Sequence, residues 1–109
     1  MPARYDLSLP ENQRKLDVVE ELAALADEAG LTLIELALAF VLRHPTITSA
    51  IIGPRTMEQL EGQLGAAETE LSTDVLDRID ELVPPGTNFN AADAGWQPPW
   101  LDDAAQRRR

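Results

Sequence analysis

The chain has 109 residues, 44% of them hydrophobic, so it is long enough for one modest core and too apolar to remain disordered. Its 19 Asp and Glu residues outnumber its 9 Lys and Arg residues and give a net charge of −10. This charge argues against nucleic acid and anionic membranes as partners, because both bind basic surfaces. The absence of cysteine from the sequence excludes disulfides, thiolate catalysis and cysteine-ligated metal sites.

The hydropathy pattern indicates a soluble, cytoplasmic protein. The longest apolar run, Leu36–Leu42, is too short to cross a bilayer. Residues 1–20 contain Asp6, Glu11 and Asp17 where a signal peptide would have a hydrophobic core. The Asp and Glu pairs have no histidine or third carboxylate at ligand spacing, so no metal site is predicted.

The first predicted helix begins near Pro10, after an incoming loop, and ends before Gly30. Proline is tolerated in a first helical turn because its missing N–H would have had no partner there, and glycine commonly follows a helix end. Apolar residues recur at helical spacing and should form the buried face: Leu16, Val19, Leu22, Leu25, Ala26 and Ala29.

A capping box of Thr32 and Glu35 opens the second predicted helix, residues 33–44, which Pro45 ends. The sequence of this helix, LIELALAFVLRH, is apolar on almost every side. We therefore expect neighbouring structure to cover most of its surface.

The segment Ile47–Ile52, ITSAII, is the one predicted strand. Its β-branched residues and its boundaries at Pro45 and Gly53 are typical of a strand, and the apolar or small residues on both faces indicate a buried strand of a parallel sheet. A single strand cannot satisfy its own backbone hydrogen bonds, and the sequence offers no neighbouring strand.

The turn Gly53–Arg55 follows this strand and leads into a helix that Thr56 caps together with Gln59. A glycine-containing turn at a helix start offers free backbone N–H groups and the positive end of the helix dipole to an anion, and an arginine adds a fork of donors. We therefore expect a phosphate site here, against the alternative of a solvated turn arginine. The apolar residues of this helix that should be buried are Met57, Leu60, Leu64 and Ala67.

Ser72 caps the last predicted helix, which Pro84–Gly86 ends. Residues 87–109 form a C-terminal loop and tail, with Trp96 and Trp100 expected to pack rather than to line a substrate pocket. Arg107–Arg109 are expected to be solvated. The expected buried face of the helix comprises Val75, Leu76, Ile79, Leu82 and Val83.

Helices around a single buried strand predict an α/β fold rather than a helical bundle. Because the neighbouring strands are missing, two interpretations stay open. Either the chain is an incomplete piece of a larger sheet or barrel, or the strand assignment is wrong.

The stretch LALAFVLRHPTITSAIIGPRTMEQLEGQLGAAETELSTDVLDRIDEL resembles the C-terminal end of an aldo-keto reductase, whose fold is a (β/α)8 TIM barrel. In that family a WVLRHP-like helix end leads into the eighth strand, an IIG-x-R turn and a helix with a QL-x-EN motif. The likeness runs from Asp6 to Leu101. It implies that residues 1–109 are one partial domain, a C-terminal TIM-barrel fragment that is mostly helical with one buried strand. It also implies an oxidoreductase that reduces aldehydes or ketones, as small-molecule carbonyl substrates, with NADPH.

The resemblance further implies that the turn and helix after the eighth strand bind NADP(H). By position, Gly53 allows close backbone approach, Arg55 contacts the adenosine phosphate end, and Gln59 faces the same ligand. Gly62 and Gln63 replace the family's Glu-Asn pair, so we expect no contact from position 62 and an amide contact to adenine from Gln63. The implied cofactor-binding residues are Ile52, Gly53, Pro54, Arg55, Gln59 and Gln63.

The family's catalytic Asp, Tyr, Lys and His tetrad does not map onto this chain. Tyr5 and Lys15 lie on the incoming segment and His44 precedes the strand, whereas catalytic residues of such barrels lie at the C-terminal ends of strands. We therefore predict no catalytic residue and an inactive isolated chain. The alternatives are a stand-alone helical interaction module without catalysis and a helix-turn-helix regulator, which the acidic charge and the strand disfavour.

Overall fold

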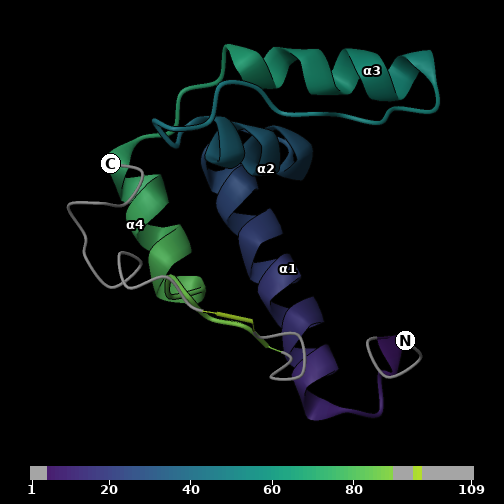
Figure 1. The fold of residues 1–109 in the computed structure, drawn as a ribbon, viewed down its shortest axis with the longest axis vertical. Coiled ribbons are helices and arrows are strands. Elements are labelled where there is room, and N and C mark those ends of the chain that lie inside the picture. Colours follow the sequence, from purple (N-terminus) through teal and green to yellow (C-terminus); the bar gives the residue numbers. More distant parts are fainter. Residues whose placement is uncertain (1–4, 90–94, 97–109) are drawn as a thin grey trace.

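The computed structural model describes residues 5–89 and 95–96. The helices of this part are α1 (Pro10–Glu28), α2 (Leu33–Leu42), α3 (Met57–Leu64), the 3₁₀ helix η2 (Gly65–Ala67) and α4 (Thr73–Leu82). Helix α1 contacts α2 and α4, whereas α3 contacts only α2 and η2 strongly. Figure 1 shows the result, with α3 set apart at the top of the view and the long α2–α3 connection below it.

Both ends of α1 lie where the sequence predicts them. Pro10 occupies the first helical turn. At the other end Gly30 adopts a φ of 71°, a left-handed conformation that favours glycine, and Leu31 N–H donates to Ala26 O at 2.9 Å. This C-terminal turn redirects the chain into α2.

The capping box of α2 is confirmed. Glu35 N–H donates to the Thr32 hydroxyl at 3.2 Å, and Thr32 N–H donates to Glu35 Oε2 at 2.8 Å. The helix ends at Leu42 rather than at the predicted His44, because Arg43 already serves as its C-cap.

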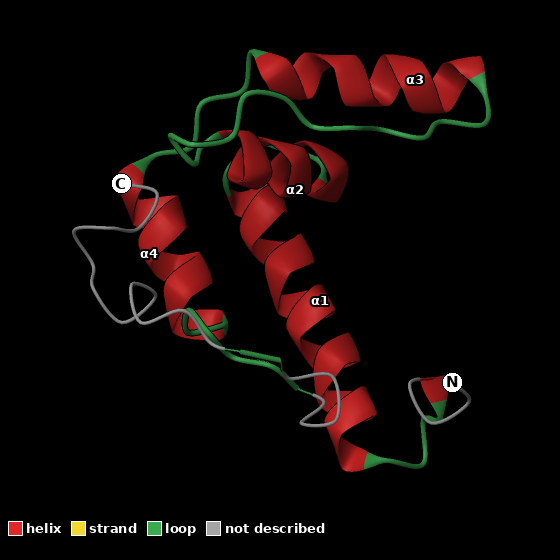
Figure 2. Cartoon of the chain, viewed as in Figure 1, coloured by secondary structure: helices red, strands yellow, loops and turns green. Residues whose placement is uncertain are grey.

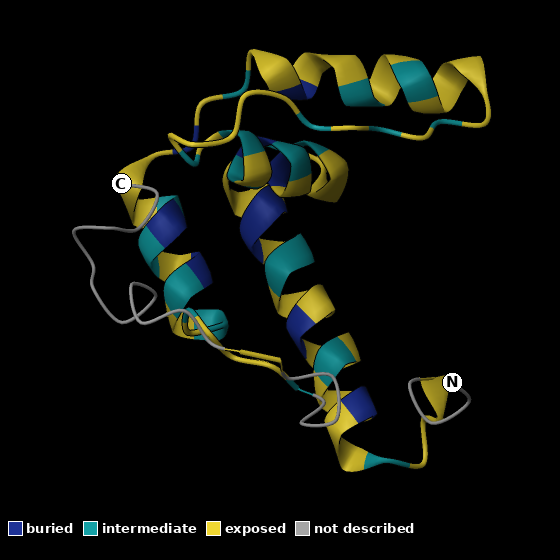
Figure 3. Ribbon diagram, in the orientation of Figure 1, coloured by how far each residue is buried: buried dark blue, intermediate teal, exposed yellow. Residues whose placement is uncertain are grey.

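One apolar core holds α1, α2 and α4 together. Figure 3 shows buried residues on each of these helices. On α1, Leu25 and Ala26 are buried as predicted, but Leu16 and Val19 are about half exposed because Val18 occupies the inward position of that turn. The buried cluster comprises Leu25, Ala26, Leu36, Ala39, Leu71, Leu76 and Ile79.

The predicted buried strand is absent from the described residues, and so is any other strand (Figure 2). The segment Ile47–Ile52 is irregular, and the side chain of Ile51 is fully exposed at 101%. The physical reason is the one that the sequence raises: a strand forms only where neighbouring strands accept and donate its backbone hydrogen bonds. The described chain is therefore helical, and the α/β expectation is not met within it.

The expected coverage of α2 and α3 is also wrong for the described residues. Ile34 and Val41 of α2 are exposed by 50% and 44%, and α3 has no buried residue. Met57 and Leu64 are exposed, and Ala66 in η2 is buried in place of Ala67. These helices turn apolar side chains toward solvent because the part of the chain described supplies too few elements to cover them.

Helix α4 follows its prediction. The Ser72 hydroxyl accepts from Val75 N–H at 3.3 Å, Leu76 and Ile79 are buried, and Gly86 adopts a φ of 85° in the turn after the helix. Trp96 is 74% exposed, which contradicts the packing expected for it. The same expectation for Trp100, and that of a solvated tail at 107–109, fall outside the described residues.

Candidate functional site

The candidate cofactor site is the turn Gly53–Arg55 and the start of α3. Thr56 is the N-cap, with extended backbone angles (φ −129°, ψ 160°), and its hydroxyl accepts from Gln59 N–H at 3.2 Å. The remaining N–H groups of a first helical turn have no partner inside the helix. The local sequence thus builds a capped helix start behind the turn, as predicted.

Arg55 presents an uncommitted cation at this turn. Its side chain is exposed and forms no salt bridge with any residue that the structure describes. Its backbone N–H donates to Gln59 Oε1 at 2.8 Å, so the main chain below the guanidinium is anchored. The arrangement leaves the guanidinium itself free to bind an anion.

Gly53 lies in open space. A Cβ built on it would meet no atom within 4 Å, and its φ is not in the left-handed region. Neither the fold of the described residues nor the turn therefore requires glycine at this position. A glycine at this position does, however, let a ligand approach the backbone closely, because glycine has no side chain.

Ile52 and Gln63 line the same pocket, which includes none of the turn residues Gly53–Arg55. They line a mostly apolar pocket of about 290 Å³ with residues of α2, the α2–α3 connection and η2. The Gln63 Oε1 atom is buried there without a hydrogen-bond partner among the described residues. An amide oxygen in that state is able to accept a hydrogen bond from an incoming N–H donor.

The predicted site residues thus fall into two groups. Gly53, Pro54 and Arg55 form the turn, to which Gln59 of α3 is hydrogen-bonded, whereas Ile52 and Gln63 line the separate pocket. The hydrogen bond between Arg55 N–H and Gln59 Oε1 was not predicted from the sequence. The T-x-x-Q pattern signals a reciprocal cap, but the same pattern leaves open which N–H the Gln59 side chain accepts from.

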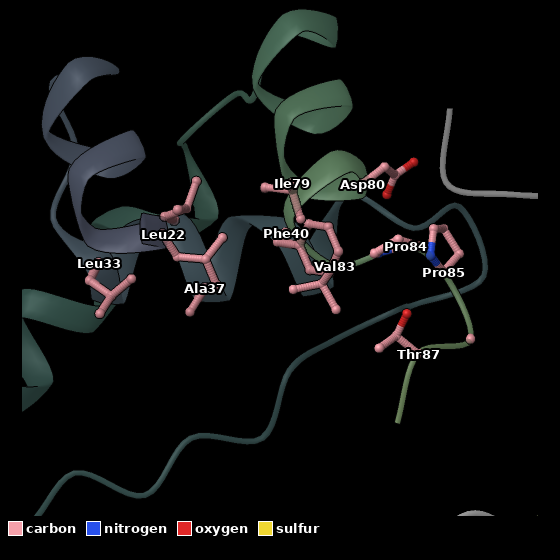
Figure 4. A pocket seen from close by; sticks show the side chains of 12 residues that line it. Leu22, Leu33, Ala37, Phe40, Ile79, Asp80, Val83, Pro84, Pro85 and Thr87 are labelled. Carbon is pink, nitrogen blue, oxygen red and sulfur yellow. The ribbon is translucent and has the colours of Figure 1, made fainter. Parts of the chain in front are cut away.

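A separate apolar pocket of about 380 Å³ contains none of the predicted site residues. Figure 4 shows Leu22 of α1, Phe40 of α2 and Ile79 of α4 among its lining side chains. Its lining residues include Asp80 and no Arg, Lys or His. Because a carboxylate repels a phosphate, this pocket does not suit a phosphate-bearing cofactor.

Tyr5, Lys15 and His44 do not form a catalytic cluster. Tyr5 is exposed, and the Lys15 ammonium donates to Asn12 Oδ1 at 3.0 Å in the same surface hollow. His44 lies elsewhere and pairs through Nδ1 with Thr46. No described residues converge as a nucleophile, a base and an orienting group.

Among the described residues, two carboxylates have a shifted pKa, and neither belongs to the turn. Hydrogen bonds from Ser8 lower the pKa of Asp6, and hydrogen bonds from Thr32 lower the pKa of Glu35. Both shifts come from local capping or turn contacts that favour the charged form.

Two negative findings concern the described residues alone. Among residues 5–89 and 95–96, no three metal-ligating side chains gather in one place. No helix in this part of the chain has the length and hydropathy of a membrane span.

Curated proteins similar to this chain match it over a short share of their own length. A putative voltage-gated potassium channel subunit beta of Schizosaccharomyces pombe is 33% identical over 79 residues, which cover 71% of this chain and 23% of that protein. The uncharacterized oxidoreductase YrpG of Bacillus subtilis is 39% identical over 66 residues, 61% of this chain and 20% of that protein. Protein tas of Escherichia coli is 41% identical over 58 residues, 53% of this chain and 17% of that protein. No solved structure matches the chain.

The family model of the aldo/keto reductases matches residues 2–84. This range includes the turn at 53–55 and every helix of the described part. The match covers well over half of the chain, and an oxidoreductase stands among the relatives. The chain belongs to the aldo/keto reductase family.

Proposed function

We propose that this chain is the C-terminal, NADP(H)-binding part of an aldo/keto reductase, an oxidoreductase that reduces aldehydes or ketones in its complete form. Membership of the family supports the activity class. The observation that carries the proposed site is the free guanidinium of Arg55 on an anchored turn at the start of α3. The relatives are matched over 17–23% of their length, so the activity of a whole reductase is part of this proposal.

The residues present fit the phosphate end of a dinucleotide. Arg55 pairs with the 2′-phosphate, because a guanidinium forms two parallel charge-assisted hydrogen bonds with such a group. Gly53 gives the backbone room, with Ile52 and Pro54 on either side of it. The unpartnered Gln63 Oε1 accepts a hydrogen bond from the adenine amino group.

NADPH, when bound, supplies the hydride that reduces the carbonyl carbon. The residues of this chain contribute binding and orientation, which hold the cofactor in position. We assign no catalytic residue here, because Tyr5 and Lys15 share a surface hollow whose lining includes no histidine or carboxylate, and His44 lies elsewhere. The proton donor and its supporting residues belong to the other units of a barrel.

In that barrel the segment Ile47–Ile52 becomes the eighth strand. Its β-branched sequence and the complete exposure of Ile51 both fit a strand that lacks its neighbours in this chain. The exposed apolar residues of α2 and α3 then pack against the barrel. Residues 1–109 form one partial domain of a cytoplasmic enzyme in this proposal.

Equilibrium titration of the 109-residue chain with NADPH and with NADH tests the cofactor site. Intrinsic tryptophan emission and NADPH emission both report binding. We expect saturable binding of NADPH and binding of NADH that is weaker by about tenfold or more, the contribution of a charge-assisted hydrogen bond. Equal affinity for the two cofactors, or no saturable binding, would contradict the proposal.

A further inference from the structure

We infer that Gln59 is a positioning residue: its side-chain oxygen holds the backbone of Arg55, so Gln59 sets cofactor selectivity through Arg55. The inference rests on the proposed NADP(H) site. Its basis is the 2.8 Å hydrogen bond from Arg55 N–H to Gln59 Oε1. Because Gln59 Oε1 already accepts this hydrogen bond, it is engaged with the Arg55 backbone and not with a ligand.

A second helix start in the same chain shows what is unusual about this bond. At α2, Glu35 stands three residues after Thr32 and accepts from the N–H of Thr32 itself. At α3, Gln59 stands three residues after Thr56 but accepts from the N–H of Arg55, one residue earlier. The two starts share the bond from the backbone N–H at the third position to the threonine hydroxyl. They differ in the N–H that the Glu or Gln side chain accepts from, and at α2 the Thr32 hydroxyl also donates to Glu35 Oε2 at 2.8 Å.

The displaced bond has two consequences for an anion. It ties Arg55 to the helix, so the guanidinium extends from a fixed main chain instead of from a mobile turn. It also leaves the N–H of Thr56, which a regular capping box would occupy, without a hydrogen-bond partner among the described residues. The main chain of Arg55 is therefore fixed relative to the N-terminus of α3. This fixed arrangement reduces the conformational entropy that is lost when a phosphate binds.

A double-mutant cycle separates positioning from direct contact. The probe is adenosine 2′,5′-bisphosphate, titrated by NMR into the chain and into the variants Gln59→Met, Arg55→Ala and Gln59→Met/Arg55→Ala. If Gln59 acts through Arg55, Gln59→Met weakens binding by about tenfold in the original chain and by less than about twofold once Arg55 is alanine. A direct contact instead gives the same factor in both backgrounds, and that result would overturn the inference.

Hydrogen exchange of the Arg55 backbone amide measures the strength of its hydrogen bond to Gln59 Oε1 in the absence of ligand. Gln59→Met should speed this exchange by about tenfold or more, whereas Gln59→Glu keeps an acceptor oxygen and should preserve most of the protection. Unchanged exchange in Gln59→Met would also overturn the inference.

The matched control is Glu35→Met, which breaks the side-chain cap of α2. It should lower stability and leave the affinity for the bisphosphate within about twofold of the original, because Glu35 does not touch the turn. A loss as large as that of Gln59→Met would mean that any weakened cap reduces binding. Failure of the original chain to bind the bisphosphate would refute the NADP(H) site itself, whereas binding with an additive cycle would refute only the role of Gln59.

Discussion

Glu35 and Gln59 show how far a residue's role can be predicted from local sequence. Both follow a capping threonine by three positions, and both threonines accept from the backbone N–H at that position, as the pattern predicts. The side chains then diverge, since Gln59 bonds to Arg55 and Glu35 to Thr32. Which N–H a side chain reaches depends on the path of the preceding turn, and that path is not encoded in a four-residue pattern.

The Glu35 contact makes a prediction about acid stability. Hydrogen bonds from Thr32 lower the pKa of Glu35 below its ordinary value of 4.5, so the folded chain favours the carboxylate. This stabilisation is present above pH 4.5 and is lost as the pH falls through the lowered folded-state pKa. Glu35→Gln keeps an acceptor oxygen without titrating, so its melting temperature should fall less than that of the original chain between pH 5 and pH 3.

Thermal melts followed by circular dichroism over this pH range measure the effect. Asp6→Asn serves as a comparison, because the pKa of Asp6 is also lowered but through Ser8 in the incoming turn. An identical pH dependence in the original chain and in Glu35→Gln would show that this contact does not contribute to acid stability.

At the scale of elements, helices could be predicted and the strand could not. The boundaries of α1 and α4 depend on residues inside or next to each helix, such as Pro10, Gly30 and Ser72. A strand depends on partners elsewhere, and the described chain contains none for Ile47–Ile52. On α1 the predicted inward face is confirmed at Leu25 and Ala26, which belong to the core shared with α2 and α4, but it is wrong at Ala29, which is exposed.

The same substitution at two isoleucines tests whether the helical core is packed and the segment Ile47–Ile52 is not. Ile79 is 7% exposed in the core of α4, whereas Ile51 is 101% exposed in the α2–α3 connection. Ile79→Val should lower the free energy of unfolding by about 0.5–1.5 kcal/mol, because it removes a buried methylene group, and Ile51→Val should change it little. Urea unfolding of both variants provides the comparison. Equal losses would mean that the segment at Ile51 is packed in solution and that its exposure here is wrong.

At the scale of the whole molecule, the cofactor end and the catalytic end of the proposed reductase are separate. The exposed apolar residues of α2 and α3 mark the surfaces that other barrel units cover in that proposal. Sequence predicted the family and the position of the turn, because both follow from a contiguous motif. The barrel context depends on strands that the described residues do not contain, so it stays a proposal.

This separation predicts that the 109-residue chain has no reductase turnover. Tyr5 and Lys15 share a hollow that includes no residue of the proposed cofactor site, and His44 lies elsewhere, so none of the three is placed to protonate a carbonyl oxygen as a hydride arrives. NADPH absorbance at 340 nm, followed with a panel of aldehydes, should therefore decline no faster than in buffer. Turnover that follows the chain through two independent columns would refute this prediction.

Substitution of Arg55 tests whether this residue recognises the 2′-phosphate of NADPH. The dissociation constants of NADPH and NADH are measured for the original chain, for Arg55→Ala and for Arg43→Ala, which removes an exposed arginine outside the turn. Arg55→Ala should weaken NADPH binding by about ten- to a hundredfold, because a hydrogen bond to a charged group contributes roughly 1.5–3 kcal/mol. NADH binding should hardly change, Arg43→Ala should have little effect on either cofactor, and added salt should reduce the difference by screening the phosphate. Equal losses for NADPH and NADH in Arg55→Ala would show that Arg55 only shapes the turn, and would contradict its role in recognising the 2′-phosphate.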